Sequence, residues 1–198
     1  MADITGSNGN DFFFFQGNEE HLTLSFTNPF SGITYNIDDD MNVNTASYEG
    51  LAGIDTIFMS NLGDALFLRD HVSGDRTVSN VEVFFAGAGG DVIHLADTTY
   101  TLGDITVDGG AAEDIILSNI GDDTLNGREG DDIIDGGPGN DWLNGGSGNG
   151  NNSGDDWLSC GAGADYLNGE DGNDTLVFFT DGTFTADFGG YNICSPGV

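Results

Sequence analysis

GGAAEDIIL (109–117) opens a stretch of the chain that repeats every nine residues. The further units are SNIGDDTLN (118–126), GREGDDIID (127–135), GGPGNDWLN (136–144), NNSGDDWLS (151–159), CGAGADYLN (160–168) and GEDGNDTLV (169–177), with GGSGNG (145–150) inserted before the fifth unit. The sixth residue of each unit is always aspartate, and the eighth is always isoleucine or leucine. Agreement at both positions in every unit predicts a fold built from stacked repeats.

These units follow the pattern G-G-x-G-x-D-x-U-x, in which U is a large aliphatic residue. By these residues the chain resembles the RTX (haemolysin-type calcium-binding) family over about a third of its length. The resemblance implies an all-β fold, a parallel β-roll or right-handed β-solenoid, with calcium ions in rows along both edges. We therefore expect calcium, as several ions, to be the cofactor.

The chemistry of one unit is consistent with this resemblance. Calcium takes six to eight oxygen ligands, and the glycines of a GGxGxD turn allow positive φ angles that direct backbone carbonyls inward. The next three residues form a short strand whose middle, aliphatic side chain points to the core. Two units then complete one coil, so alternate units stack about 4.8 Å apart on the same edge.

The resemblance further implies which residues would hold the ions. Carried over to this chain, the stacked pairs are Asp114 with Asp132, Asp123 with Asp141, Asp132 with Asp156, Asp141 with Asp165, and Asp156 with Asp174. Asp91, in the related unit AGAGGDVIH (86–94), joins them. The expected carbonyl ligands are Gly127, Gly130, Gly136, Gly139, Gly163, Gly169 and Gly172. We expect the fifth-position aspartates Asp122, Asp131 and Asp155 to be solvated charges.

Several units depart from the pattern. Ala112 replaces a glycine at the fourth position, and Ser118-Asn119 and Asn151-Asn152 replace glycine pairs. Asparagine tolerates left-handed conformations, so these turns can still form. The six inserted residues, 145–150, should bulge at one edge.

The charge of the chain also points to cations. Its 34 acidic residues, three arginines and no lysine give a net charge of −31 at pH 7, so the compact state should be weak without bound cations. Nucleic acid and anionic membranes are disfavoured partners. Hydrophobic residues make up 37% of the chain, which is too rich for permanent disorder. Together these properties predict a chain that folds when it binds calcium.

The first half of the sequence indicates an irregular β region. Degenerate repeat units occur at 5–15 and 50–58, and strands are expected at 21–26, 32–37, 62–69 and 78–85, with another strand and turn within 95–108. Phe12 to Phe15 is interpreted as a buried first strand that seals one end. Asp38 to Asp40 is interpreted as a solvated turn, with an extra cation site as the alternative. The expected divisions are a β-rich N-terminal region (1–85), the β-roll (86–177) and a C-terminal cap (178–198).

Three further features have alternative interpretations. Trp142 and Tyr166 should project outward on adjacent coils, with Trp157 on the opposite sheet; the pair could bind a sugar or dock a partner, or the C-terminal tail could cover it. Cys160 and Cys194 are a candidate disulfide, the alternative being two free thiols. The three histidines have no metal-ligand spacing.

The sequence thus predicts a non-catalytic calcium-binding β-roll module of a secreted or cell-surface bacterial protein. The chain shows no secretory signal peptide and no apolar stretch that could insert into a membrane, and the resemblance implies type I secretion. The C-terminal FGGYNICSPGV contains no recognisable export signal, which suggests an atypical signal or a piece of a longer protein. The alternatives are an adhesive or carbohydrate-binding module, and an accessory part of a secreted polysaccharide- or lipid-acting enzyme. Neither HExxH nor GxSxG occurs.

Overall fold

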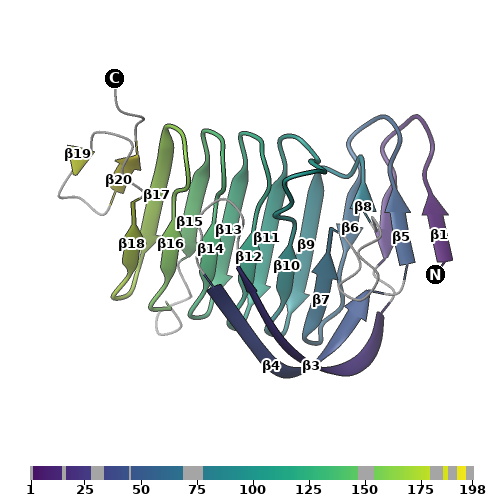
Figure 1. Ribbon diagram of the computed structural model, residues 1–198, viewed down its shortest axis with the longest axis horizontal. Helices are drawn as coiled ribbons and strands as arrows, with labels where there is room; N and C mark the ends of the chain where they lie inside the picture. The colour runs from purple at the N-terminus through teal and green to yellow at the C-terminus, as the bar shows by residue number, and fades with distance from the viewer. Residues whose placement is uncertain are drawn as a thin grey trace.

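The computed structural model describes residues 2–14, 17–27, 34–44, 46–68, 78–146, 154–178, 185–186 and 191–194. Within these residues the regular structure is entirely β, which confirms the expected all-β class. Among them, no helix is long and apolar enough to cross a membrane. The strands form two long sheets and one short sheet (Figure 1).

The nine-stranded sheet carries half of the repeat strands. In spatial order it contains β2 (Phe12–Phe14), β6 (Thr56–Phe58), β9 (Val83–Ala88), β11 (Thr106–Ala111), β13 (Thr124–Glu129), β15 (Trp142–Gly146), β17 (Asp165–Glu170), β20 (Tyr191–Cys194) and β19 (Thr185–Ala186). Neighbours from β2 to β17 run parallel, and β20 joins antiparallel. The pair β19 and β20 therefore ends this sheet near the C-terminus.

The eight-stranded sheet carries the other half. It contains β3 (Gly17–Thr27), β4 (Thr34–Asn44), β7 (Asp64–Phe67), β10 (Val92–His94), β12 (Ile115–Leu117), β14 (Ile133–Asp135), β16 (Trp157–Ser159) and β18 (Thr175–Val177). From β4 to β18 the neighbours run parallel. The short sheet contains β1 (Ala2–Thr5), β5 (Ala46–Glu49) and β8 (Val78–Ser79).

The strand register confirms that two nonapeptides make one coil. Leu125 pairs with Leu143, and Leu143 with Leu167, along the nine-stranded sheet. Ile116 pairs with Ile134, and Ile134 with Leu158, along the other sheet. Successive units thus lie in alternate sheets, and each coil adds one strand to each sheet.

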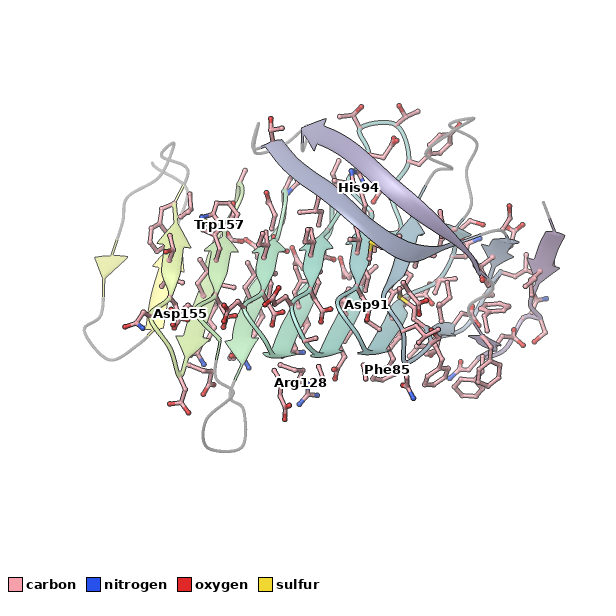
Figure 2. All side chains as sticks on the ribbon, turned by 90° about the horizontal axis from the view of Figure 1, so that it is seen from below. Phe85, Asp91, His94, Arg128, Asp155 and Trp157 are labelled. Carbon is pink, nitrogen blue, oxygen red and sulfur yellow. The ribbon has the colours of Figure 1, made fainter. Side chains whose placement is uncertain are left out.

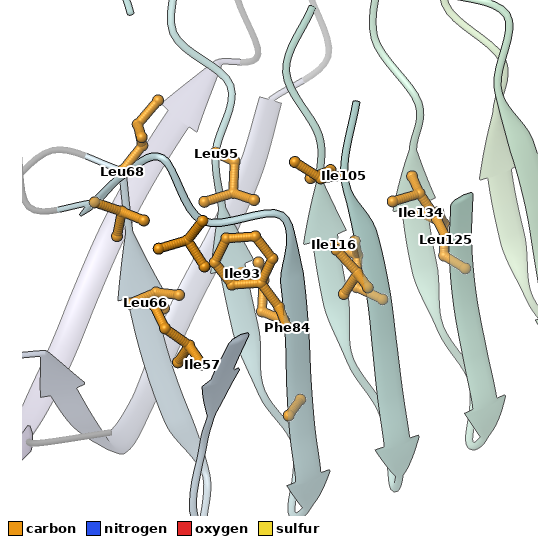
Figure 3. Packing of buried hydrophobic residues seen from close by; sticks show 14 of the residues in the cluster. Ile57, Leu66, Leu68, Phe84, Ile93, Leu95, Ile105, Ile116, Leu125 and Ile134 are labelled. Atoms are coloured by element: carbon orange, nitrogen blue, oxygen red, sulfur yellow. The ribbon is translucent and has the colours of Figure 1, made fainter. Parts of the chain in front are cut away.

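The core lies between the two long sheets (Figure 3). The eighth-position side chains of both sheets point inward, and they form one continuous cluster with related residues of the first half: Ile57, Leu66, Phe84, Ile93, Val107, Ile116, Leu125, Ile134, Leu143, Leu158 and Leu167. Each is at most 1% exposed. The aliphatic position of the repeat is therefore the core position, as expected.

A long antiparallel hairpin, β3 with β4, crosses the outer face of the eight-stranded sheet (Figure 2). Met41 and Val43 pack there against Ala65, Phe67 and Val92, which gives this face a second, smaller core. The two expected strands are confirmed and are longer than expected, while the turn between them lies outside the described residues. The interpretation of residues 38–40 as a turn was wrong, because they continue β4 into this packed segment.

The expectation of a buried strand at Phe12 to Phe15 was only partly right. Phe13 is 5% exposed, but Phe12 and Phe14 are 65% and 71% exposed. Successive side chains of a strand face opposite ways, so only one of these three can enter the core. Both exposed rings contact Phe58, which stacks on Phe85 at a centroid distance of 5.2 Å. Phe15 lies outside the described residues.

Two other expected strands are shorter than the sequence suggested. The 62–69 stretch forms β7 over Asp64–Phe67, and the 78–85 stretch divides between β8 and β9. Within 95–108, strand structure begins at Thr106. The parallel stacking of both long sheets also includes β6, β7 and β9, and so begins well before the first complete nonapeptide.

Candidate metal centre

Six aspartates form a continuous ladder at the turns that lead into the eight-stranded sheet. In order along the stack they are Asp64, Asp91, Asp114, Asp132, Asp156 and Asp174. Each backbone N–H donates a hydrogen bond to Oδ1 of the next aspartate, and these distances run from 2.6 to 3.0 Å. The first five residues are at most 2% exposed. The glycine-rich turns thus place one buried carboxylate on each consecutive coil of the roll, and each coil is one rung of the ladder.

A second ladder lies at the turns that lead into the nine-stranded sheet. The N–H of Asp123 donates to Oδ1 of Asp141, and the N–H of Asp141 donates to Oδ1 of Asp165, each at 2.9 Å. Together the two ladders place all five expected aspartate pairs on neighbouring rungs. The pair Asp132 and Asp156, which spans the insertion, has the same geometry as the others, at 2.9 Å.

The second carboxylate oxygen of most ladder residues is buried and lacks a hydrogen-bond partner. Among the described residues this holds for Oδ2 of Asp91, Asp114, Asp132, Asp141, Asp156 and Asp165, and for Oδ1 of Asp64. Buried polar atoms are almost always paired, since an unpaired one costs about 1–3 kcal/mol. A cation on this side of each carboxylate would satisfy these oxygens, so the residues fit the metal that the repeats imply.

The glycines shape the space beside these oxygens. A Cβ on Gly109 would lie 2.5 Å from Oδ2 of Asp114 and 2.7 Å from the carbonyl oxygen of Gly127, so a carboxylate and a carbonyl of the next rung converge there. The first-position glycines Gly127, Gly136 and Gly169 likewise border Oδ2 of their own aspartates. At the fourth position, side chains on Gly130, Gly139, Gly163 and Gly172 would collide with the backbone of the preceding rung.

Among the described residues, the ladder carboxylates do not form clusters of three. Within the described residues, no group of three or more His, Cys, Asp or Glu side chains is placed to hold an ion. An ion bound at a rung must therefore take part of its oxygen shell from backbone carbonyls such as that of Gly127. The glycine carbonyls expected as ligands from the repeat stay a prediction.

Burial changes the acidity of the ladder. It raises the pKa of Asp91, Asp114 and Asp132 to about 8, and that of Asp141 to about 9. The pKa of Asp156 rises to about 7 and that of Asp165 to about 6 for the same reason. The hydrogen bond from the preceding N–H opposes these shifts, and neighbouring carboxylates add to most of them. Without a cation, Asp91, Asp114, Asp132 and Asp141 therefore resist ionisation at neutral pH.

Asp123 differs from its neighbours because its turn begins with serine. The Ser118 hydroxyl donates to Oδ2 of Asp123, so this oxygen has a partner within the chain. Desolvation raises the pKa of Asp123 to about 6, and the Ser118 hydrogen bond limits the rise. The rung before Asp123 carries Ile105, whose N–H donates to Oδ1 of Asp123 at 2.9 Å.

The turn of the fifth unit begins with other residues than the nonapeptide pattern predicted. Gly145 borders Oδ2 of Asp156, as first-position glycines do in the other turns, and Gly146 has a φ of 138°. Gly145 and Gly146 therefore form the glycine pair beside Asp156. Asn151-Asn152, the expected replacement of this pair, lies outside the described residues. Residues 147–153 lie outside the described residues.

The fifth-position residues form a separate, exposed ladder. Asp122 accepts the N–H of Asn140 at 2.8 Å, and Asp131 accepts that of Asp155 at 2.8 Å. Asp155 in turn accepts the N–H of Asn173 at 2.8 Å. These aspartates are exposed, as expected of solvated charges, but they also bond successive rungs together.

Sequence reasoning missed Asp64 as a member of the ladder, although a signal was present. Asp64 and Leu66 have the spacing of the sixth and eighth positions, but no glycine pair precedes them. Their unit lacks the turn glycines, and the ladder is nevertheless continuous, since Asp64 donates to Asp91 at 2.6 Å. Glu82 was missed for a similar reason, because a longer carboxylate takes the position of aspartate next to Asp55.

The aromatic pair is placed as expected. Trp142 and Tyr166 lie on adjacent strands of the nine-stranded sheet with ring centroids 4.1 Å apart, and Trp157 belongs to the other sheet. Trp142 is 53% exposed. Cys160 is buried, with Sγ 3.7 Å from the carbonyl oxygen of Gly161. The side chain of Cys194 lies outside the described residues, so the disulfide with Cys160 stays a prediction.

Two stacked parallel sheets with aspartate ladders along both edges define a parallel β-roll with cation-binding turns. The family model for the RTX calcium-binding nonapeptide repeat (4 copies) matches residues 106–125, 117–151 and 150–178. Residues 106–178 are therefore RTX calcium-binding repeats, as the sequence resemblance indicated, and calcium binding is implied by them. No curated protein and no solved structure gave a significant match to the chain.

Proposed function

We propose that this chain is a non-catalytic calcium-binding module of a secreted or cell-surface bacterial protein, and that it folds on binding calcium outside the cell. The observation that carries the proposal is the row of buried carboxylate oxygens without hydrogen-bond partners, such as Oδ2 of Asp114, Asp132 and Asp156. These oxygens lie beside backbone carbonyls in turns that have no space for side chains. Such an arrangement suits a hard cation with oxygen ligands.

The repeats have little else to hold them together. One aliphatic side chain per nonapeptide contributes about 1.5–3 kcal/mol. Ordering nine residues of backbone costs roughly 1–2 kcal/mol for each residue. The acidic composition of the chain adds repulsion, since its formal net charge is −31 at pH 7. Bound calcium would supply positive charge and direct coordination to the unpaired oxygens, and so would favour the folded state alone.

The proposed location follows from the same dependence. RTX repeats are typical of proteins exported by type I secretion. A chain whose repeats fold only at high calcium would stay unfolded in a calcium-poor cytoplasm and become rigid outside. Type I secretion and a non-catalytic role are both part of this proposal.

Hydrogen exchange of the full chain tests this function directly. With excess calcium, the amides of β11 to β18 should exchange slowly, and in excess chelator they should exchange at the rates of an unfolded chain. Magnesium at the same concentration is the control for ionic strength. Slow exchange of these strands in chelator would contradict calcium-dependent folding.

A second candidate function is sugar binding at Trp142. The indole is 53% exposed, stacks against Tyr166 at 4.1 Å, and has Thr124 beside it on the next strand. An exposed aromatic face can stack on a sugar ring. Glycan binding by the calcium-loaded protein should be lost in Trp142→Ala and kept in Phe85→Ala, which alters an exposed ring elsewhere on the same sheet. Binding that survives Trp142→Ala would exclude this surface, and hydrolysis of a polysaccharide would favour the accessory-enzyme alternative.

A further inference from the structure

Exposed phenylalanine rings gather at the end of the nine-stranded sheet that β2 forms, the end marked by Phe85 in Figure 2. Phe12 and Phe14 of β2 are 65% and 71% exposed, and Phe85 of β9 is 39% exposed. Phe58 of β6 lies in register between Phe14 and Phe85 and stacks with both, at centroid distances of 5.9 and 5.2 Å. Since a whole aromatic side chain has about 150–250 Å² to bury, these rings leave roughly 300–400 Å² of apolar surface in water. Patches of this size often serve binding.

This surface carries no charged side chain. We call its four rings the phenylalanine patch: Phe12, Phe14, Phe58 and Phe85. Thr56 and Val83 lie in register with Phe12 on β6 and β9, so the outward positions of all three strands are uncharged here. The chain has a formal net charge of −31 at pH 7, so two copies repel each other wherever their acidic surfaces meet. The phenylalanine patch is a surface at which two copies can approach without that cost.

β2 is also the last strand of its sheet, and one of its edges has no partner among the described strands. The carbonyl of Asp11 accepts the N–H of Thr56 at 2.9 Å, so it points toward β6. Main-chain groups of consecutive strand residues point to opposite edges, so those of Phe12 and Phe14 point to the open edge. Unpaired N–H and C=O groups on an edge strand are a template for another strand. At the other end of this sheet β20 supplies such a strand, antiparallel to β17.

The sequence of β2 suits pairing with a second β2. Phe-Phe-Phe reads the same in both directions, so a two-fold axis at Phe13 places Phe12 of each copy opposite Phe14 of the other. Residues that face each other in this way across an antiparallel pair exchange both main-chain hydrogen bonds. Their rings lie on the same face of the joined sheet, where aromatic cross-strand pairs are stabilising. Each copy therefore presents the edge and the rings that the other requires.

We propose that two copies of this chain associate through β2, with the two strands antiparallel and the two phenylalanine patches side by side. The two nine-stranded sheets then continue into each other across the two-fold axis, and the exposed rings of β2 pack at the joint. The contact also closes the open edge of the roll, as a solenoid end requires. This association goes beyond calcium binding, and the matched repeats at 106–178 take no part in it.

Sedimentation velocity of the full chain in excess calcium tests the association. As the protein concentration rises, the unaltered chain should pass from the mass of one chain to the mass of two. It should grow no further, because a two-fold contact is closed. A single chain at every concentration up to the solubility limit overturns the proposal, and so does growth into larger assemblies.

Two substitutions at Phe14 separate the ring from the strand edge. Phe14→Thr removes the ring but keeps the N–H and a residue suited to strands, so the Kd of the dimer should rise about tenfold. Phe14→Pro also removes the N–H that points to the open edge, while the bond from Thr56 to Asp11 is untouched. Its Kd should rise by about a further tenfold or more, because proline cannot donate to a strand partner. Equal Kd values for the two variants would overturn the edge pairing.

Ile120→Thr is the control for both substitutions. Ile120 is 45% exposed in a turn of the repeats, so the variant loses an exposed apolar side chain away from β2. The Kd of its dimer should not change. A rise equal to that of Phe14→Thr would show that the association does not depend on β2, and would overturn the proposal.

Far-UV circular dichroism in calcium shows whether the variants fold. If Phe14→Pro does not fold, Phe12→Thr decides, because Phe12 lies opposite Phe14 of the second copy and its loss should raise the Kd as much as Phe14→Thr does. Unequal effects would overturn the antiparallel register. Vesicles of phosphatidylcholine test the other apolar partner: a chain that stays single, and binds these vesicles less well as Phe14→Thr, would assign the patch to a lipid surface and overturn the proposal.

Discussion

Replacing Asp141 by asparagine should have opposite effects with and without calcium. Asp141 is 2% exposed; its Oδ1 accepts the N–H of Asp123 at 2.9 Å, and its Oδ2 has no partner. Asparagine keeps the shape of the side chain and the Oδ1 acceptor, but it removes the charge. The substitution therefore separates the cost of a buried carboxylate from its value as a metal ligand.

The size of the effect follows from the raised pKa of Asp141. Burial raises the pKa of Asp141 from 3.8 to about 9, so at pH 7 the calcium-free folded state must take up a proton that the unfolded chain does not hold. The interval between 3.8 and pH 7 corresponds to about 4 kcal/mol, at about 1.4 kcal/mol per pH unit. Asp141→Asn should recover up to about this amount in chelator. With calcium it should lose a charged ligand and bind about tenfold more weakly, or about 1.4 kcal/mol.

Urea unfolding followed by far-UV circular dichroism at pH 7 measures both effects. The chelated samples should contain a stabilising osmolyte, so that the folded state is populated enough to measure. Asp171→Asn is the matched control, because it removes the same charge from an exposed turn position. The expected result is a crossover for Asp141→Asn and small changes for Asp171→Asn.

Two outcomes would refute this reasoning. If Asp141→Asn lowers stability in chelator as well as in calcium, the buried carboxylate is not costly in the calcium-free state. If Asp171→Asn shows the same crossover, the effect comes from the net charge of the chain and not from burial within the ladder.

Three further predictions follow from single features of the ladders. In chelator, the β signal in circular dichroism should fall as the pH rises from about 4 to about 9, because burial raises the folded-state pKa of Asp114 to about 8 and of Asp156 to about 7, and such groups lose their stabilising effect as the pH passes these values; a flat profile would contradict this. Ala112→Gly should raise the unfolding free energy in calcium by about 0.5–1 kcal/mol, since Ala112 has a φ of 80°, whereas Ala111→Gly within β11 should lower it; equal effects of the two would count against a strained turn. Ser118→Ala should lower the stability of the chelated, osmolyte-supported protein by about 1–3 kcal/mol in urea melts, because Oδ2 of Asp123 loses its hydroxyl donor; no loss would show that this hydrogen bond is dispensable.

The repeat made much of the fold predictable. An aliphatic residue two positions after each aspartate defined both the inner face of every short strand and the alternation between sheets. The register of Leu125 with Leu143 and of Ile116 with Ile134 follows from that spacing. The aspartate pairs were predictable for the same reason, because a fixed period places like residues on neighbouring rungs.

The parts that were not predictable depend on tertiary contacts. Nothing local shows that the β3 and β4 hairpin covers the outer face of a sheet, since Met41 and Val43 find their partners only after the roll has formed. Gly145 and Gly146 were assigned to the insertion, because several registers satisfy the pattern and only the close approach of Gly145 to Asp156 shows that they are a glycine pair of the turn. Asp64 was overlooked because no glycine pair begins its turn.

A calcium titration of the chelated full chain shows whether the acidic ladders fold only when calcium is bound. Far-UV circular dichroism should change from a mostly unfolded spectrum to a β spectrum in one cooperative transition, and magnesium should not substitute at equal concentration. A β spectrum already present in excess chelator, and unchanged by calcium, would show that the ladders fold without the ion.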